Sequence, residues 1–149
     1  MVAGGPRKKK NNECVKVVIR CRPLFGKEVS EKRQEIVKVD IPNNKISVPN
    51  PLEPNRPPKE WTFDAVYDKN TVQKDFYDES VYPMVESVLE GFNGTIFAYG
   101  QTGCGETFTM MGAPDPPELR GVIPNSFDHI FEHIAAAPAN VEFMISAQY

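Results

Sequence analysis

The clearest chemical signal in the sequence is a glycine-rich run, Gly100-Gln101-Thr102-Gly103-Cys104-Gly105-Glu106-Thr107. Two glycines at this spacing, followed by a basic residue and a hydroxyl residue, form loops that bind phosphate groups. Glycines let backbone amides curl around phosphate oxygens, the helix that follows presents its positive end, and the hydroxyl reaches a magnesium ion. The run therefore predicts a phosphate-binding loop in which Thr107 binds the metal.

Glu106 occupies the position where this pattern requires a positive charge. A unit charge about 4 Å away is worth about 4 kcal/mol at an effective dielectric of about 20, and a glutamate both removes an attraction and adds a repulsion. A micromolar nucleotide site has only about 8 kcal/mol of binding free energy in total. The missing lysine also normally stabilises charge on a transferring phosphoryl group. We therefore expect nucleotide binding to be weak or absent, and useful hydrolysis to be lost.

The segments around the loop have the pattern that such a loop needs. An apolar run at residues 95–99 predicts a buried strand before it, and a helix is expected to begin at Thr107. Residues 112–121 contain three prolines and predict a loop. Beyond them, the pattern predicts an amphipathic helix at 124–137 and a strand at 141–149. The expected inner face of that helix consists of Phe127, Ile130, Phe131 and Ile134.

Earlier in the chain, short β-branched and alternating segments predict strands. They lie at residues 14–20, 36–39, 45–48 and 61–67. The turn Pro42-Asn43-Asn44 joins the middle two as a hairpin. Apolar residues at helical spacing then predict a helix over 71–92, which Pro83 should break or divide in two. With the strand, loop and helix around the glycines, these elements indicate an α/β phosphate-loop fold.

Length and composition limit the classes of function. A chain of 149 residues forms one domain, and its 40% hydrophobic and 25% charged residues are ordinary for a soluble protein. The net charge of −3 does not favour nucleic acid as a partner. No apolar run approaches the roughly 18 to 20 residues of a membrane span, and the N-terminus lacks a secretory signal, so we expect a cytoplasmic protein without membrane contact. Residues 1–13 are polar and basic and predict a disordered arm.

Four segments of the sequence are informative together: residues 18–24, 63–67, 91–103 and 120–131. In this order they resemble motifs of the kinesin motor domain. Val18-Ile19-Arg20-Cys21-Arg22-Pro23-Leu24 is similar to the family's adenine-side loop, and Phe63-Asp64-Ala65-Val66-Tyr67 to the motif after its first hairpin. Residues 91–103, which lead into the glycine loop, are close to diagnostic. Residues 120–131 resemble most closely the subfamily whose heterotrimers drive transport along cilia. The resemblance covers residues 14–149 in the family's order.

The resemblance implies a phosphate-loop NTPase fold with a central mixed sheet flanked by helices, and ATP-driven movement along microtubules. In the implied pocket, Arg20, Arg22 and Pro23 flank the adenine, residues 100–105 wrap the phosphates of ATP, and Thr107 binds Mg²⁺. The implied partner is tubulin in microtubules, and the implied location is the microtubule cytoskeleton, including cilia. Glu106 stands against the binding of ATP and Mg²⁺ in this chain.

The resemblance also implies that residues 14–149 are the N-terminal part of a truncated motor domain. Family members continue with two switch segments that sense the γ-phosphate, the main microtubule-binding elements and a neck, and none of those motifs occurs here. The sequence has no heptad stretch for a dimerising coiled coil. In the family's sheet, the strand before the phosphate loop lies between strands from the later part, so residues 95–99 are expected to have unpaired edges.

Three hypotheses follow for the function. The chain is a piece of a motor ATPase, or it is a degenerate, non-catalytic kinesin-like protein that at most binds a partner. The third hypothesis is a zinc peptidase, because His129, Glu132 and His133 match the H-x-x-E-H pattern. The sequence has no other histidine, so two surface histidines on an amphipathic helix are the simpler interpretation. Glu106 and the missing switches favour the non-catalytic hypothesis, whereas the resemblance favours the motor.

Overall fold

Two strands from distant parts of the chain pair at the centre of the structure. The computed structural model describes residues 15–148, so the predicted arm at 1–13 lies outside the described residues. Strands β1 (Val18–Arg20) and β5 (Ala65–Tyr67) run parallel, with Ile19 opposite Val66. Parallel strands are normally buried and apolar, and Val66 is only 1% exposed. The strand predicted at 14–20 is confirmed over its second half.

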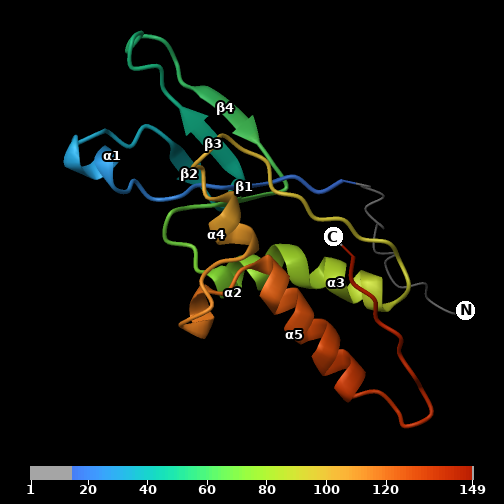
Figure 1. Ribbon diagram of the computed structural model, residues 1–149. Coiled ribbons are helices and arrows are strands. Elements are labelled where there is room, and N and C mark those ends of the chain that lie inside the picture. The colour runs from blue at the N-terminus through green and yellow to red at the C-terminus, as the bar shows by residue number, and fades with distance from the viewer. Residues whose placement is uncertain (1–14, 149) are drawn as a thin grey trace, which may run out of the picture.

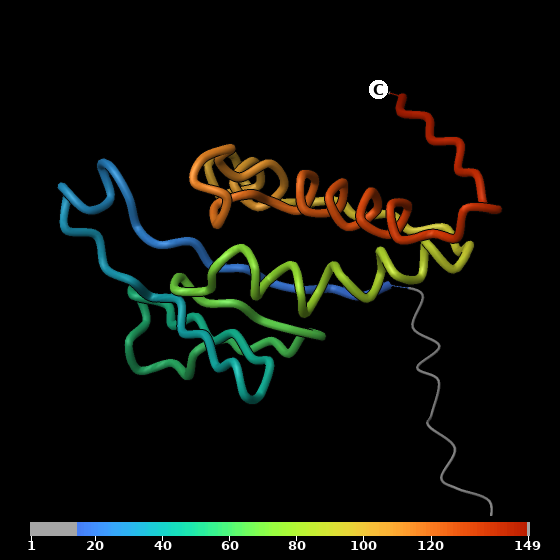
Figure 2. The backbone as a smooth tube through the Cα atoms, turned by 90° about the horizontal axis from the view of Figure 1, so that it is seen from below, coloured from blue at the N-terminus to red at the C-terminus, as the bar shows by residue number. Residues whose placement is uncertain are grey.

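A second, antiparallel sheet contains β2 (Lys38–Asp40), β3 (Lys45–Val48) and β4 (Lys59–Thr62), in that order. It extends away from the helices at one end of the molecule, behind the short helix α1 (Lys27–Ser30) (Figures 1 and 2). The predicted hairpin is confirmed, because β2 pairs with β3 across a turn where Asn44 has a φ of 52°. Asparagine tolerates this left-handed conformation better than most residues do.

The strand predicted at 61–67 is wrong as a single element, because the chain changes sheets within it. The amide of Phe63 still donates to the small sheet, at the carbonyl of Asn44 (3.0 Å), whereas the amide of Asp64 donates to Val17 beside β1 (3.1 Å). The carboxylate of Asp64 also accepts from the amide of Val17 (2.6 Å). These contacts join segments far apart in the chain, so the alternating pattern contains no signal of the bend.

The helix predicted at 71–92 is confirmed, with the break that Pro83 predicts. It consists of α2 (Gln73–Phe76), a π-helical turn η1 (Tyr77–Val81) and α3 (Tyr82–Leu89). Pro83 has no N–H to donate to the carbonyl of Glu79 one turn earlier, and the hydrogen-bond pattern changes there. The ammonium group of Lys16 donates to that carbonyl instead (3.3 Å).

The hydrophobic core lies between the central strands and the helices. Its buried side chains are those of Tyr67, Phe76, Tyr77, Val81, Val85 and Val122. The rings of Tyr67 and Phe76 meet edge to face, with centroids 4.9 Å apart. The core therefore joins β5 to the helical run formed by α2, η1 and α3, and to Val122 later in the chain.

The chain after the glycine loop forms α4 (Glu106–Met110), a 3-10 turn η2 (Pro117–Leu119) and α5 (Val122–Ala135). The loop predicted at 112–121 and the helix after it are confirmed, although the helix begins two residues earlier than expected. Gly121 is required where the two meet, because a Cβ there would lie 2.6 Å from the carbonyl oxygen of Met110. No helix in the described part of the chain has the length and apolar character to span a bilayer.

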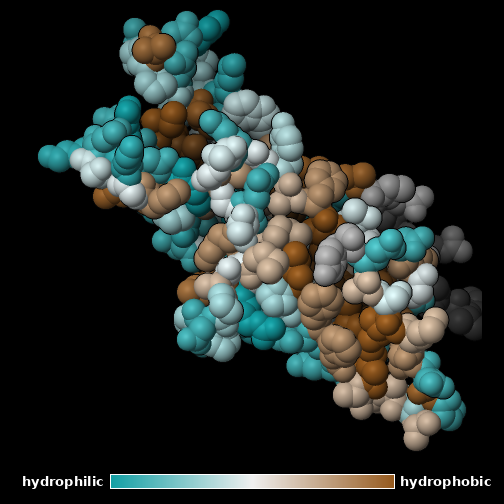
Figure 3. All heavy atoms as spheres, viewed as in Figure 1, coloured by the Kyte–Doolittle hydropathy of each residue, from teal (hydrophilic) through white to brown (hydrophobic). Residues whose placement is uncertain are grey.

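The predicted inner face of α5 is partly wrong. Ile130 packs against the core, but Phe127 and Phe131 are 52% and 55% exposed. Helix α5 lies beside α3 (Figure 2), and His129 contacts that helix, so the two phenylalanines turn away from it. Nothing among the described residues covers them, and apolar side chains gather on this face of the molecule (Figure 3).

Two predicted strands, at 95–99 and 141–149, are not formed within the described residues. Apart from Ile96, which packs against the core, both segments are exposed, with Phe97 at 79%, Tyr99 at 93% and Met144 at 97%. A strand requires a neighbour that supplies backbone hydrogen bonds, and no described segment pairs with either one. The two strand predictions are therefore wrong for the described residues, and residues 95–99 make no backbone hydrogen bond within that part of the chain.

We expect amide protons of residues 95–99 to exchange with solvent at close to the rate of an unstructured peptide, because no described group protects them. Amides of α3 and α5 should exchange at least about 100-fold more slowly, since local opening there requires disruption of the core. Hydrogen exchange followed by NMR or mass spectrometry measures both. Slow exchange at 95–99 at low protein concentration would contradict the unpaired arrangement.

Candidate nucleotide pocket

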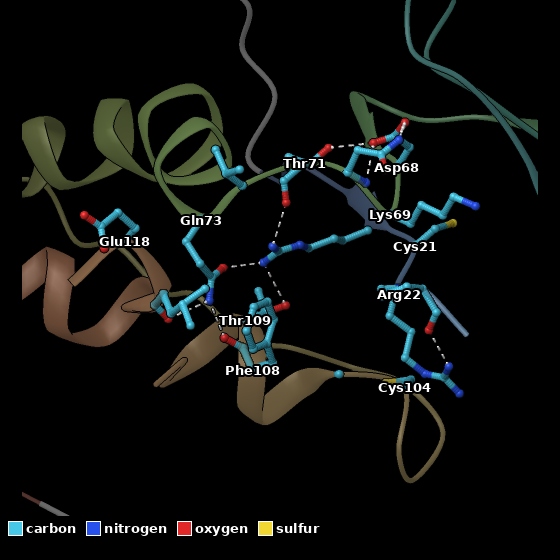
Figure 4. A pocket seen from close by; sticks show the side chains of 16 residues that line it. Cys21, Arg22, Asp68, Lys69, Thr71, Gln73, Cys104, Phe108, Thr109 and Glu118 are labelled. Carbon is cyan, nitrogen blue, oxygen red and sulfur yellow. Dashed lines mark hydrogen bonds between the residues drawn. The ribbon is translucent and has the colours of Figure 1, made fainter. Parts of the chain in front are cut away.

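A cavity of about 310 Å³ lies beyond the C-terminal ends of the parallel strands β1 and β5 (Figure 4). Its walls come from residues 20–23 after β1, residues 68–73 after β5, the glycine loop with α4, and residues 118–119. In α/β proteins, ligands bind at the carboxyl ends of parallel strands, where loops from different strands converge. The place of the cavity in the fold thus makes it the candidate site.

Arg20, predicted to flank a base, forms one wall and connects three elements. Its guanidinium group donates to the Gln73 side-chain oxygen (2.6 Å), the Thr109 hydroxyl (3.3 Å) and the Thr71 carbonyl (3.2 Å). It also lies over the rings of Phe76 and Phe108, with its central carbon 5.0 and 5.3 Å from their centroids. Burial lowers the pKa of Arg20, although an arginine remains protonated at neutral pH.

Gln73 is a site residue that sequence reasoning missed. Its side chain is buried, with 3% exposure, and its amide nitrogen donates to the carbonyls of Phe108 (2.6 Å) and Leu119 (3.2 Å). Its oxygen accepts from Arg20, so one amide group fixes α2 against both α4 and η2. No local pattern marks a single glutamine in a short helix, and the contacts only appear once distant segments meet.

Arg22 braces the glycine loop. Its Nε donates to the carbonyl of Gly103 (2.8 Å), and its two terminal nitrogens donate to the carboxylate of Glu28 (2.7 and 2.8 Å). Because Arg22 and the Phe25 amide donate to that carboxylate, the pKa of Glu28 falls to about 2. The positive charge of Arg22 is therefore already neutralised by an ionised glutamate.

The glycine loop contains two residues in the left-handed region, with φ of 83° at Gly103 and 107° at Gly105. Gly100 packs against the side chain of Cys104, so that a Cβ at Gly100 would collide with the sulfur. Glu106 begins α4, and its carboxylate lies over the loop, with Oε1 3.8 Å from the place of that Cβ. The negative charge thus lies against the loop rather than away from it.

The predicted site residues divide into two groups. Arg20, Arg22, Pro23, Cys104 and Gly105 line the cavity. The others lie on the adjoining loop and at the start of α4, and all of them except Glu106 are exposed: Gly100, Gln101, Thr102, Gly103, Glu106 and Thr107. Phe108 and Thr109, which the sequence did not single out, complete the wall.

The residues present fit a base better than they fit a triphosphate with its magnesium. The cavity has an apolar side formed by Pro23, Val72 and Phe108, on which a planar ring can lie. At the phosphate side, Glu106 replaces the expected cation. Thr107, the hydroxyl predicted to bind Mg²⁺, follows Glu106 directly in the first turn of α4.

The zinc peptidase hypothesis finds no support in the structure. Both ring nitrogens of His129 have partners, since Nδ1 contacts the Tyr77 hydroxyl (3.0 Å) and Nε2 the carboxylate of Glu86 (2.7 Å). The ring also stacks on Tyr82 at 4.3 Å, and its side chain is only 12% exposed. His129 is therefore a buried link between α5 and the helical run, not the surface histidine that the sequence predicted. His133 packs edge-on against Phe143 instead.

An α/β fold with a glycine loop beside a cavity at the carboxyl ends of parallel strands is typical of nucleotide-binding proteins. The family model described as the kinesin motor domain matches residues 20–149. The chain therefore belongs to the kinesin motor domain family, as its motifs predicted.

Individual relatives agree with this assignment. Kinesin-like protein KIF3C from Pongo abelii and from Mus musculus are each 50% identical to this chain over 143 residues. The match covers 95% of this chain and 18% of each relative, so the chain spans less than a fifth of their length. A solved structure titled "Structure of a fast kinesin: Implications for ATPase mechanism and interactions with microtubules" superposes with a TM-score of 0.77 and 40% identity. That match covers 86% of this chain and 35% of the other.

Replacing Gln73 with leucine should lower the free energy of unfolding by about 1–3 kcal/mol, because Arg20 loses an acceptor and two carbonyls lose their donor. Urea unfolding followed by circular dichroism measures this change. Arg56→Ala is the matched control, since it removes only an exposed ion pair with Glu53 and should change stability by less than about 0.5 kcal/mol. Equal effects of the two substitutions would contradict the role given to Gln73.

Cys21 should be less reactive in the folded chain than in the unfolded one. Burial, with a smaller contribution from the charge of Asp68, raises the pKa of the Cys21 thiol and so lowers its thiolate fraction at a given pH. The rate of alkylation by iodoacetamide should therefore reach half its maximum at a higher pH for the folded chain in buffer than for the chain unfolded in about 8 M urea. Peptide mapping by mass spectrometry resolves Cys21 from the other cysteines, and coincident pH profiles would refute this expectation.

Proposed function

We propose that this chain forms the nucleotide-pocket part of a kinesin-type motor domain, with the base-binding side retained and the phosphate side impaired. The observation that carries the proposal is the carboxylate of Glu106 against the glycine loop. Gly103 and Gly105 have positive φ and the helix α4 follows them directly, and this arrangement supports descent from a working phosphate site. Its charge opposes the ligand that such a site binds.

The proposal places the chain between the motor and the non-catalytic hypotheses. Mg²⁺-ATP would supply a transferable phosphoryl group, but the residues here do not fit that group, and no hydrolytic step is assigned to them. What the chain's own residues do is hold a pocket open: Arg20 and Gln73 fix its walls, and Arg22 braces the loop. We infer a non-catalytic pocket in a motor lineage.

We assign the partner and location to the longer motor domain to which this chain corresponds. The solved kinesin structure is described as interacting with microtubules, which supports a microtubule as that partner and the microtubule cytoskeleton as the location. A location in cilia rests on the resemblance of residues 120–131 alone. We propose microtubule binding and movement only for a whole kinesin. This chain corresponds to 18% of the length of the curated relatives.

Replacing Glu106 with lysine should raise the affinity for Mg²⁺-ATP at least about 100-fold, since it turns a repulsion into an attraction at the loop. Titration calorimetry on the 149-residue chain and its Glu106→Lys variant measures the two affinities. Glu90→Lys is a control with the same change in net charge. Glu90 is exposed at the C-terminal end of α3, and residues 95–99 separate it from the glycine loop in the sequence.

Recovery of binding in Glu106→Lys alone supports the proposal. Equal Mg²⁺-ATP affinities in the original chain and Glu106→Lys would show that the charge at the loop does not control the site. A matching gain in Glu90→Lys would assign the effect to net charge alone. Either result would overturn the proposed role of Glu106.

A further inference from the structure

We propose that the pocket selects an uncharged nucleoside over the corresponding nucleotide, so that each added phosphate weakens binding. This inference rests on the proposed function, because it takes the cavity to be the base-binding side of a nucleotide pocket. It goes further by naming the ligand class that this chain prefers. Two features support it: the cations around the cavity are already occupied, and carboxylates outnumber them.

Within residues 15–148, each cation that lines the cavity already has a hydrogen-bond or ion-pair partner. Arg22 is held by both oxygens of Glu28, at 2.7 and 2.8 Å. Lys69 is held by both oxygens of Glu35, each at 2.7 Å. Arg20 donates hydrogen bonds within the wall to the Gln73 side chain, the Thr109 hydroxyl and the Thr71 carbonyl. A phosphate entering here would have to break an existing ion pair or disrupt the Arg20 contacts.

Carboxylates surround these three cations in excess. Asp68 and Glu118 line the cavity itself, Glu28 and Glu35 pair with Arg22 and Lys69 behind the wall, and Glu106 lies at the adjoining loop, so five carboxylates stand against three cations once the ion-pair partners are counted. Asp68 stays ionised at neutral pH, because hydrogen bonds from the Asn70 amide and neighbouring groups lower its pKa. The local charge is therefore negative, and a phosphorylated ligand meets a net repulsion that grows with its own charge.

The same groups suit a neutral ligand that carries hydroxyl donors. The ring of Phe108 is 45% exposed and, with Pro23 and Val72, offers an apolar surface to a planar base. Glu118 lines the opening, and no side-chain partner occupies it among the described residues. Carboxylates accept hydrogen bonds from sugar hydroxyls, whereas a phosphate has no proton to offer at neutral pH. The cavity thus matches the chemistry of a base with its unphosphorylated sugar.

Adenosine, AMP, ADP and ATP form a series that tests this inference on the 149-residue chain. We expect titration calorimetry in about 0.05 M salt to give an affinity at least tenfold higher for adenosine than for ATP, with AMP and ADP between them. Because surface charges are screened over about 10 Å at 0.1 M salt and about 3 Å at 1 M, the gap should narrow at least threefold in 0.5 M salt.

Two variants assign the preference to named residues. Glu106→Gln keeps the shape and removes the charge, so it should improve ATP affinity at least threefold and leave adenosine affinity within twofold. Phe108→Ala removes the apolar surface and should weaken adenosine at least fivefold. Thermal unfolding of each variant, followed by circular dichroism, checks that the fold persists.

The outcomes separate this inference from the proposed function. If the original chain binds ATP as tightly as adenosine, or if Glu106→Gln leaves ATP affinity unchanged, the selectivity proposal is wrong. If adenosine fails to bind while Glu106→Lys binds Mg²⁺-ATP, the inference fails and the proposed function stands. If no ligand binds to the original chain or to Glu106→Lys, both fail together.

Discussion

The contact between Arg20 and Gln73 is the interaction on which the rest of the pocket depends. Arg20 is half-buried at the end of β1, where its charge needs hydrogen-bond acceptors, and Gln73 supplies one at 2.6 Å. The same amide then donates to the backbone on both sides of the loop after α4. One polar pair thus fixes the distance between the central strands, the helical run and the segment that follows the glycine loop.

A second constraint is the need of strands for neighbours. The pairing of β1 with β5 gives the structure only two hydrogen-bonded central strands within the described residues. Most side chains of the extended segments 95–99 and 141–148, and those of Phe127 and Phe131 in α5, are exposed to solvent. Burial of apolar area is the main favourable term in folding, so this arrangement leaves stabilising free energy unused. The pocket is accordingly built on the half of the molecule that is packed.

The parts of the structure that local pattern controls could be predicted from the sequence. The glycine run predicted a loop before a helix, the Pro42-Asn43-Asn44 turn predicted a hairpin, and Pro83 predicted a break in a helix. The parts controlled by distant contacts could not. Asp64 turns the chain between two sheets through Val17, and Gln73 meets Arg20 across 53 residues of sequence. Residues 95–99 have the composition of a strand, but pairing depends on a neighbour that composition does not reveal.

The position of Glu106 in the first turn of α4 has a consequence for the local balance between stability and function. A carboxylate near the N-terminal amides of a helix is favourable by about 0.3–1 kcal/mol, and a lysine there is unfavourable by a similar amount. In a working phosphate loop, the lysine at this position therefore interacts unfavourably with the helix N-terminus until an anionic ligand binds. In this chain the residue at that position is Glu106, whose charge is favourable beside the N-terminal amides of α4. The N-terminus of α4 is therefore stabilised without an anionic ligand.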